Sequence, residues 1–331
     1  MYRWIINGKL AVSRMPYPHE IPELASIFDS VVILIEPHEY PGMSIQNYIR
    51  QWRSYGVEIY YNPTRDWWPP HLLELYNIVK WIKSRLDYGH KVLVHCMGGI
   101  GRSGTVAAAY LVYAHNYTPW DAVIRVRKKI PGALEVARQE KMVYDLYSLL
   151  KFLPKPYLDK IVGLASKYDY GAGIKHASKV TQLSVELLSD LDIVRELSRE
   201  SKMATTASAI VHEIIKCDCV KSEESLKILR SGNIDDFLSS LIIDTLAQYC
   251  SLDYREDIGL NASILAISDY LDYTRDQSVD YIEYDTLEGS SVIRVYCEFD
   301  CSKNIMKAKE VRRFLETCIG TKIEISLAYS G

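Results

Sequence analysis

The chain has 331 residues and a net charge of −3; 48% of its residues are hydrophobic and 24% charged, a balance that excludes disordered, collagen-like and low-complexity proteins. The 39 Lys and Arg against 42 Asp and Glu create no basic field, so we expect neither nucleic acid nor a membrane as partner. No apolar run approaches a membrane span and the N-terminus lacks the apolar core of a signal peptide, which favours a cytoplasmic protein.

The first half of the chain alternates between strand and helix patterns. Short apolar runs at 31–35 and 91–95 predict buried strands, and 57–61 is a further strand candidate. Helices are predicted over 71–86, 104–115 and 119–129. This alternation predicts an α/β domain, residues 1–153, with a mainly parallel sheet flanked by helices.

The pattern changes after a proline-bearing segment, 151–156, which we expect to be a linker. Helices are predicted over 158–167, 174–191, 203–215, 234–250 and 262–273, followed by a hairpin (279–285 and 291–298) around Glu288-Gly289, a helix over 304–318 and a strand over 322–327. The second domain, 158–331, is therefore expected to be mostly α-helical with a small α+β end.

The seven cysteines show no regular spacing. An odd number argues against a disulfide framework across the chain, and we expect free thiols. Few Asn and Gln residues suggest a thermophile, in which one or two disulfides can still form. Cys217 and Cys219 lie close together, but no second pair at zinc-ligand spacing accompanies them.

The most informative segment is the glycine-rich run between the strand ending at 95 and the next helix. Its glycines allow successive backbone N–H groups to point inward around an anion, and the helix beginning near Ser103 adds its positive end. Arg102 offers a planar fork for two phosphate oxygens. These groups favour a thiolate at Cys96, which is then a nucleophile aimed at the bound anion. The expected phosphate-binding residues are Met97, Gly98, Gly99, Ile100, Gly101 and Arg102.

This segment resembles the signature of the cysteine-dependent tyrosine and dual-specificity phosphatases, with the small archaeal type as the best match, over roughly residues 1–150. The resemblance implies Cys96 as nucleophile and Arg102 as phosphate binder. It also implies that Ser103 assists the departure of Cys96 when the phosphoenzyme is hydrolysed. His95 matches the histidine that precedes the cysteine, and its expected role is to orient the loop.

Such a mechanism needs a proton donor, because a tyrosine leaving group has a pKa near 10. Asp66 is the candidate: it lies in a loop with two tryptophans and two prolines, and the resembling family places its acid in a similar loop. The tryptophans would lower the dielectric around the carboxyl group. The alternative is an N-cap of the following helix. Glu74 and Asp87 are less suitable acids.

Two further segments gain a role from the resemblance. The segment 131–139 matches one whose glutamine positions water, a role that falls on Gln139; the alternative is a solvent-facing helix residue. The segment 13–17 matches a substrate-facing loop, in which Tyr17 would stack on an aromatic substrate.

The second half resembles a helical HD domain such as that of exopolyphosphatases and guanosine pentaphosphatases. HD enzymes hold a metal with a histidine, a His-Asp pair and a distant aspartate, which correspond here to His176, His212, Glu213 and Asp269. Glu213 departs from this pattern, and its extra methylene moves the carboxylate. We therefore expect a vestigial site without metal, in a regulatory or ligand-binding domain whose histidines pack in the core.

These features together predict a metal-independent phosphomonoesterase without cofactor, acting through a phosphocysteine on phosphotyrosine or with dual specificity. The loop lacks lysines, which disfavours inositol phosphates. The alternatives are a phosphatase for polyphosphate or a phosphorylated nucleotide, a non-enzymatic sensor, and a metal-dependent hydrolase in the second half. The partner is accordingly a phosphorylated protein or a small phosphorylated anion.

Overall fold

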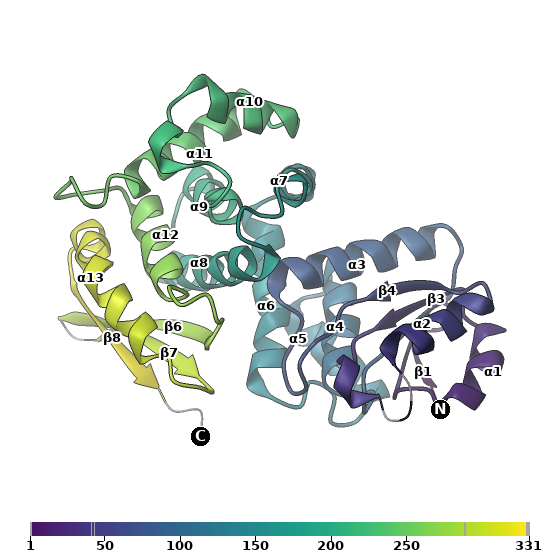
Figure 1. Ribbon diagram of the computed structural model, residues 1–331. Helices are drawn as coiled ribbons and strands as arrows, with labels where there is room; N and C mark the ends of the chain where they lie inside the picture. Colours follow the sequence, from purple (N-terminus) through teal and green to yellow (C-terminus); the bar gives the residue numbers. More distant parts are fainter. Residues whose placement is uncertain (1, 41, 43, 288, 329–331) are drawn as a thin grey trace. The chain divides into compact units, whose positions relative to one another are not determined.

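The computed structural model describes residues 2–40, 42, 44–287 and 289–328. The chain forms two compact units, Met1–Tyr147 and Ser148–Gly331, which are described separately (Figure 1). Helix α6 (Ala137–Phe152) runs past this division, and α7 (Lys155–Lys167) starts three residues after it, with Pro154 as its N-cap. The proline segment expected to be a linker therefore consists mainly of a helix end and a helix start.

The first unit is built on a five-stranded sheet in the order β1-β2-β5-β3-β4. Its strands are β1 (Tyr2–Ile6), β2 (Leu10–Ser13), β3 (Ser30–Ile33), β4 (Glu58–Tyr61) and β5 (Val92–His95). The pairings β2–β5, β5–β3 and β3–β4 are parallel, whereas β1 and β2 form an antiparallel hairpin. The sheet is thus mixed. The predicted parallel strands are present, but the hairpin was not predicted.

Helices cover both faces of this sheet (Figure 1). The short helix α1 (Ile21–Ala25) and α2 (Ile45–Ser54) bury Leu24 and Trp52 against one face, together with Val31, Ile33 and Leu93 of the strands. The helices α3 (Leu72–Asp87), α4 (Arg102–His115) and α5 (Pro119–Lys129) belong to the other layer. Burying one large apolar side chain contributes about 1.5–3 kcal/mol, so these layers fix the position of β5 firmly.

The second unit is mostly helical. Its helices are α7, α8 (Ile174–Arg195), α9 (Arg199–Val211), α10 (Glu223–Ser231), α11 (Asp236–Tyr249), α12 (Leu260–Tyr270) and α13 (Ser302–Ile319). All but α10 correspond to predicted helices. Strands β6 (Val279–Leu287) and β7 (Ser290–Cys297) pair antiparallel, and β8 (Lys322–Ala328) joins β7 in parallel after α13. Gly289, with φ +77°, lies in the hairpin turn; Glu288 lies outside the described residues.

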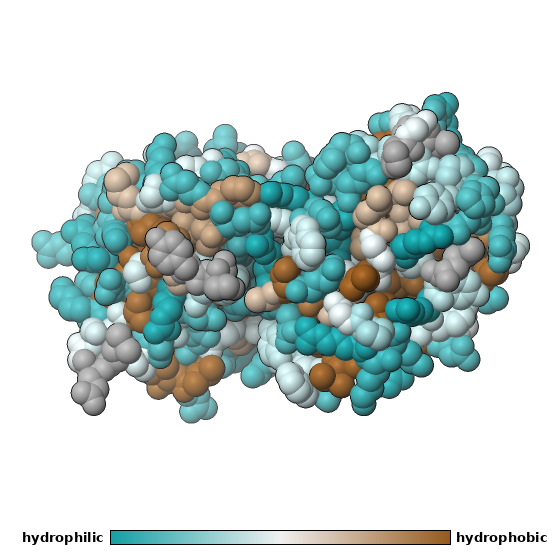
Figure 2. Space-filling model, turned by 90° about the horizontal axis from the view of Figure 1, so that it is seen from below, coloured by the Kyte–Doolittle hydropathy of each residue, from teal (hydrophilic) through white to brown (hydrophobic). Residues whose placement is uncertain are grey.

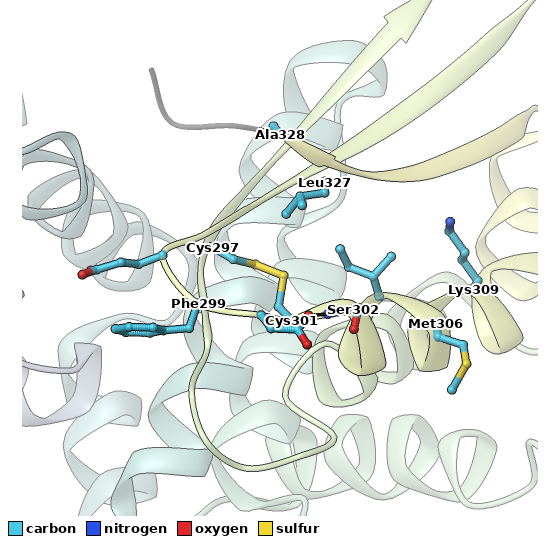
Figure 3. Close-up of a pocket in the computed structure, with 11 residues that line it drawn as sticks. Cys297, Phe299, Cys301, Ser302, Met306, Lys309, Leu327 and Ala328 are labelled. Carbon is cyan, nitrogen blue, oxygen red and sulfur yellow. Dashed lines mark hydrogen bonds between the residues drawn. A yellow bond between two sulfur atoms is a disulfide. The ribbon is translucent and has the colours of Figure 1, made fainter.

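Cysteines join two pairs of positions in the second unit. Disulfides link Cys217 to Cys250 and Cys297 to Cys301, and the free thiols are Cys96, Cys219 and Cys318. The bond between Cys297 and Cys301 borders a pocket of about 640 Å³ in front of α13, drawn in Figure 3. Free thiols were predicted, and one or two disulfides were also allowed for in the sequence analysis.

Apolar surface is scattered. On the face drawn in Figure 2, hydrophobic residues form several small groups among hydrophilic ones. Among the described residues, every helix is too short or too polar to cross a bilayer.

Candidate active site

The nucleophile candidate lies where the central strand ends. Cys96 follows β5 directly, is 2% exposed, and precedes the loop that leads into α4. The backbone N–H of Gly99 donates to its Sγ at 3.2 Å, and the Ser103 Oγ lies 3.2 Å from the same sulfur. The N–H donates to the sulfur, and in the contact with Ser103 either the hydroxyl or the thiol can be the donor. A cysteine sulfur at the start of a glycine-rich loop and ahead of a helix N-terminus is placed as a nucleophile can be.

Glycine is required at one position of this loop. Gly99 has φ +75°, and a Cβ there would lie 2.5 Å from the carbonyl carbon of Ser13. The backbone N–H of Met15 also donates to the carbonyl of Met97 at 3.1 Å. The loop is therefore held against the segment after β2, which brings the expected substrate-facing residues beside it.

Arg102 is a buried cation that several hydrogen bonds hold in place. It is 1% exposed, and its two terminal nitrogens donate to the Glu39 carboxylate at 2.6 and 2.7 Å. One of them also donates to the carbonyl of Thr64 at 2.7 Å. Its Nε is buried and has no protein partner, so one N–H donor is left for a ligand. A buried, unpaired donor beside a loop of backbone N–H groups points to a bound anion.

Glu39 was missed by the sequence analysis. It ends a short 3₁₀ turn, Pro37–Glu39, beyond β3. Burial tends to raise its pKa, but the hydrogen bonds from Arg102 and from the backbone of Glu36 hold that pKa below its usual value. The sequence contained only a weak signal for this residue. A carboxylate that follows a buried strand lies at the carboxyl edge of a parallel sheet, which is where ligands bind in such folds.

His95 supports the loop from within the sheet. Its side chain is fully buried, with Nε2 3.2 Å from the Tyr48 hydroxyl and Nδ1 3.4 Å from the carbonyl of Cys96. Burial lowers the pKa of His95 to about 3 and raises that of Tyr48 well above its usual value. A neutral ring that accepts from Tyr48 and donates to the Cys96 carbonyl satisfies all these contacts. The orienting role expected of His95 stays a prediction, and these contacts are compatible with it.

Asp66 lies next to Arg102, as the proposed acid must. Its Oδ1 is 2.9 Å from an Arg102 nitrogen and accepts the backbone N–H of Trp67 at 3.0 Å. The side chain is 56% exposed and Trp67 52%, so the tryptophans do not shield this carboxyl as expected. The N-cap of α3 is His71, so Asp66 does not serve as the N-cap of this helix, which was its alternative role.

The two fallback acids have other tasks. Glu74 accepts the backbone N–H of His71 and caps α3. Asp87 pairs with Lys83, one turn earlier on the same helix.

Gln139 lies against the loop. It is fully buried, which the solvent-facing alternative did not allow, and its Oε1 accepts the backbone N–H of Glu135 at 2.9 Å. A Cβ at Gly101 would lie 2.7 Å from its Nε2, and this Nε2 is buried without a protein partner. An unpaired amide donor of this kind is available to a water or a ligand.

Glu135, also missed, places a carboxylate at the N-terminus of α4. It accepts a hydrogen bond from the backbone of Gly101, and burial together with the nearby Asp66 raises its pKa. A helix N-terminus favours a negative charge, so this carboxylate occupies a position suited to an anion.

Tyr17 is 50% exposed, and the Arg14 guanidinium lies 4.7 Å from its ring centre. Arg14 is itself held by Glu20 at 2.7 and 3.0 Å. A hollow of about 530 Å³ lies beside Gly98, Gly99 and Arg14.

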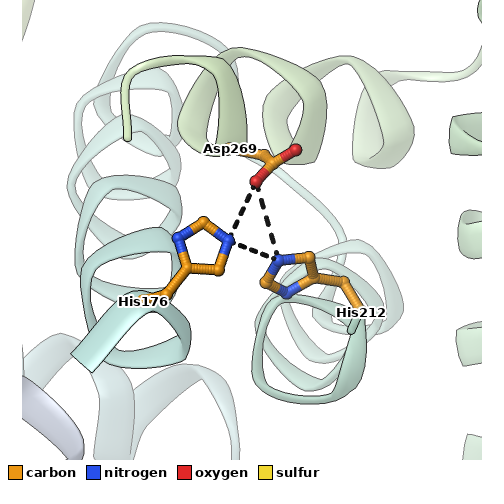
Figure 4. Close-up of side chains that lie close together, drawn as sticks. All are labelled: His176, His212 and Asp269. Atoms are coloured by element: carbon orange, nitrogen blue, oxygen red, sulfur yellow. Dashed lines mark hydrogen bonds and ion pairs between the residues drawn. The ribbon is translucent and has the colours of Figure 1, made fainter. Parts of the chain in front are cut away.

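The four expected metal-site residues of the second unit also lie close together. His176 Nε2 lies 3.2 Å from His212 Nε2, 3.2 Å from Asp269 Oδ1 and 3.6 Å from Glu213 Oε1. They form the cluster drawn in Figure 4, which shows three of them.

Part of the first unit matches a known protein family. Residues 64–148 match the dual specificity phosphatase catalytic domain. This span contains Asp66, Cys96, Arg102 and Gln139.

Similar proteins agree with that match. Phosphatidylglycerophosphate phosphatase PTPMT1 of Arabidopsis thaliana is 31% identical over 150 residues, which cover 44% of this chain and 43% of the relative. Tyrosine-protein phosphatase CDC14 of Candida albicans is 24% identical over 144 residues, 39% of this chain and 26% of the relative. The chain thus spans less than half of either relative.

The crystal structure of Tk-PTP in the active form is 40% identical and covers 44% of this chain and 95% of that one, with a TM-score of 0.41. The relatives include dual-specificity, tyrosine and lipid phosphatases, and this supports a cysteine-dependent phosphatase.

Proposed function

We propose that the chain hydrolyses phosphate monoesters through a phosphocysteine on Cys96, without a metal ion. One observation carries this: a buried thiol, which accepts the Gly99 N–H and lies 3.2 Å from the Ser103 hydroxyl, shares its loop with a buried arginine whose Nε–H has no protein partner. The loop amides and Arg102 hold the phosphate dianion. Binding alone would need no nucleophile, which argues against a sensor.

In the first step, the Cys96 sulfur forms a bond to phosphorus while the bond to the ester oxygen breaks. Asp66 gives its proton to that oxygen. Its exposed carboxyl group, next to Arg102, can turn toward a bound substrate.

In the second step, water attacks phosphorus and gives a proton to Asp66. The sulfur–phosphorus bond breaks, its electron pair returns to Cys96, and inorganic phosphate leaves. The Ser103 hydroxyl donates to the departing sulfur, and the unpaired amide of Gln139 is suited to hold the water.

The preferred substrate is phosphotyrosine in a protein, alone or with phosphoserine and phosphothreonine. Tyr17, Trp67 and Met97 offer exposed apolar surface near the loop for an aromatic ring. The carboxylates of Glu39, Asp66 and Glu135 lie around Arg102 and oppose a substrate with many negative charges.

A second candidate is a non-protein phosphate monoester. The similarity of the chain to phosphatidylglycerophosphate phosphatases favours this candidate. Polyphosphate and phosphorylated nucleotides belong to the same class of alternatives.

The test is phosphate release from a phosphotyrosyl peptide in excess EDTA, with wild type beside Cys96→Ser. We expect turnover by wild type and a loss of about 10⁴-fold or more in the variant. Activity that survives the substitution would place the chemistry elsewhere. Competition by phosphatidylglycerophosphate, polyphosphate and nucleotides then ranks the substrates, and strong inhibition by one of them would favour the second candidate.

A further inference from the structure

The loop that carries Asp66 has an unfavourable backbone conformation at its tip. Residues 66 and 67 form a tight turn, closed by the Trp68 N–H, which donates to the carbonyl of Arg65 at 3.1 Å. Trp67 has φ +66°, in the left-handed region that glycine adopts readily and a bulky side chain rarely does. Such a residue persists only where its surroundings fix the turn, so other contacts must hold this one in place.

Both ends of this loop are held by the first unit, whereas its tip is exposed. The carbonyl of Thr64 accepts a hydrogen bond from Arg102 at 2.7 Å, and the two prolines at 69–70 are buried. A proline restricts the residue before it to extended conformations, which sets the direction in which Trp68 leaves the turn. The tip between these ends, residues 65–67, is exposed to solvent. The position of the turn therefore depends on what holds Trp68.

Trp68 is in contact with two arginines. The Arg138 guanidinium lies 4.6 Å from the centre of a Trp68 ring, and the Arg65 guanidinium lies 5.3 Å from it. Tryptophan gives the strongest cation–π contacts, and partial burial of Trp68 and Arg138 strengthens this one. Arg65 belongs to the turn itself, whereas Arg138 lies in the first turn of α6. Arg138 therefore ties the turn to another element of the first unit.

Arg138 and its neighbour Gln139 contact the two loops of the site. Gln139 is fully buried against the phosphate-binding loop, where a Cβ at Gly101 would lie 2.7 Å from its Nε2. Arg138, one residue earlier, contacts the loop of Asp66 through Trp68. The start of α6 thus joins the loop of the nucleophile to the loop of the proton donor.

We propose that Arg138 is a positioning residue: through Trp68 it holds the turn that directs Asp66 toward the leaving group of a bound phosphate ester. Asp66 protonates the ester oxygen in the proposed function, and the role of Arg138 rests on that step. Loss of Arg138 should therefore slow substrates whose leaving group needs a proton and spare those whose leaving group departs as an anion.

The test measures kcat/KM of wild type and Arg138→Met for aryl phosphates whose phenols differ in pKa. Methionine keeps a long apolar side chain but removes the cation. For phenols with a pKa near 10 we expect kcat/KM to fall roughly 2- to 30-fold, the range that one cation–π contact spans. For strongly acidic phenols it should stay within about twofold of wild type, because these leave without a proton. A general loss of structure would lower both values equally.

Further variants assign the effect to the contact with Trp68. Trp68→Leu should show the same dependence on the leaving group, and the double variant should lose no more than the worse single variant. Arg138→Lys keeps a cation and should recover part of the loss. Arg125→Met is the matched control: Arg125 lies on α5, 5.5 Å from the ring centre of Tyr117, and its substitution should leave all rates unchanged.

Hydrogen–deuterium exchange, followed by mass spectrometry, tests the contact without a substrate. Peptides that contain the Trp68 N–H should exchange faster in Arg138→Met than in wild type, and at the wild-type rate in Arg125→Met. Circular dichroism verifies that each variant is folded.

The outcomes separate the two proposals. An equal loss for acidic and weakly acidic phenols, or wild-type kcat/KM for both, in an enzyme that needs Cys96 would overturn the role of Arg138 alone. Wild-type exchange in Arg138→Met would overturn it as well. Turnover that is insensitive to Cys96→Ser would instead refute the proposed function, and with it the step that Arg138 is proposed to assist.

Discussion

The two units bring polar side chains together in different ways. The loop that runs from Cys96 to Arg102 collects donors for an anion from consecutive residues, most of them backbone N–H groups. The cluster of His176, His212, Glu213 and Asp269 brings ring nitrogens and carboxylate oxygens together from α8, α12 and the end of α9. In the loop, local backbone geometry places the donors; in the cluster, helix packing does.

This difference decides how each site responds to change. A glycine loop ahead of a helix keeps its donors as long as the local chain folds, whereas the cluster depends on side-chain angles across α8, α9 and α12. Yet the loop also depends on residues from far away, since Asp66 and Glu39 arrive on loops after other strands. Substitutions of these distant residues test how much the activity of the site depends on residues outside the loop.

The largest effect within this comparison is expected for Asp66→Asn. Losing the proton donor should lower kcat for phosphotyrosine by about 10²–10⁴-fold, because the phenolate then leaves unprotonated. An aryl phosphate with an acidic phenol should lose much less. Steady-state kinetics on both substrates measure the contrast.

Asp87→Asn is the matched control, since Asp87 is paired with Lys83 on α3. It should retain wild-type rates. An equal loss on both substrates by Asp66→Asn would show that Asp66 holds Arg102 and does not transfer a proton.

The parts of the structure that were predicted from the sequence are those that residues near one another determine. Strands β3, β4 and β5 and helices α3, α4 and α5 follow from apolar runs and periodicity, whereas α2 was not predicted. The β1–β2 hairpin, with strands of four and five residues that gain stability from β5, carries too little pattern of its own. Glu39 was not predicted as a site residue because its partner Arg102 lies 63 residues away in the sequence.

Glu39→Gln should lower kcat/KM roughly 10- to 100-fold. The buried Arg102 would lose its bidentate carboxylate and part of its orientation toward phosphate. Kinetics and the inhibition constant of inorganic phosphate report the change. Glu36→Gln, in the same turn, is the control. Tighter phosphate binding in Glu39→Gln would mean that Glu39 competes with the substrate.

A smaller effect concerns pH and the first unit alone. The pKa of His95 is lowered to about 3 in the folded chain, against about 6.5 when unfolded. Below pH 6.5 the histidine is protonated in the unfolded chain but stays neutral in the folded chain. The free energy of unfolding therefore decreases as the pH is lowered. This histidine should cost about 2 kcal/mol between pH 7 and pH 5.

Urea unfolding followed by tryptophan fluorescence measures this loss, because all six tryptophans lie within the first 120 residues. His95→Gln removes the titration and should flatten the pH dependence, even if its stability at pH 7 is lower. An unchanged slope in the variant would assign the loss to other groups.

The smallest expected effect is at the edge of the loop. Tyr17→Ala should raise KM for a tyrosyl phosphate roughly two- to tenfold, the range of one aromatic contact, and leave KM for an alkyl phosphate unchanged. Tyr17→Phe should behave as wild type, and Tyr88→Ala, at a tyrosine 80% exposed on the end of α3, is the surface control. If both substrates lost affinity equally, Tyr17 would act by packing on Arg14 and not by contact with the substrate ring. The preference of the first unit for its substrates would then come from the loop alone, which, unlike the histidine–carboxylate cluster of the second unit, is built from consecutive residues.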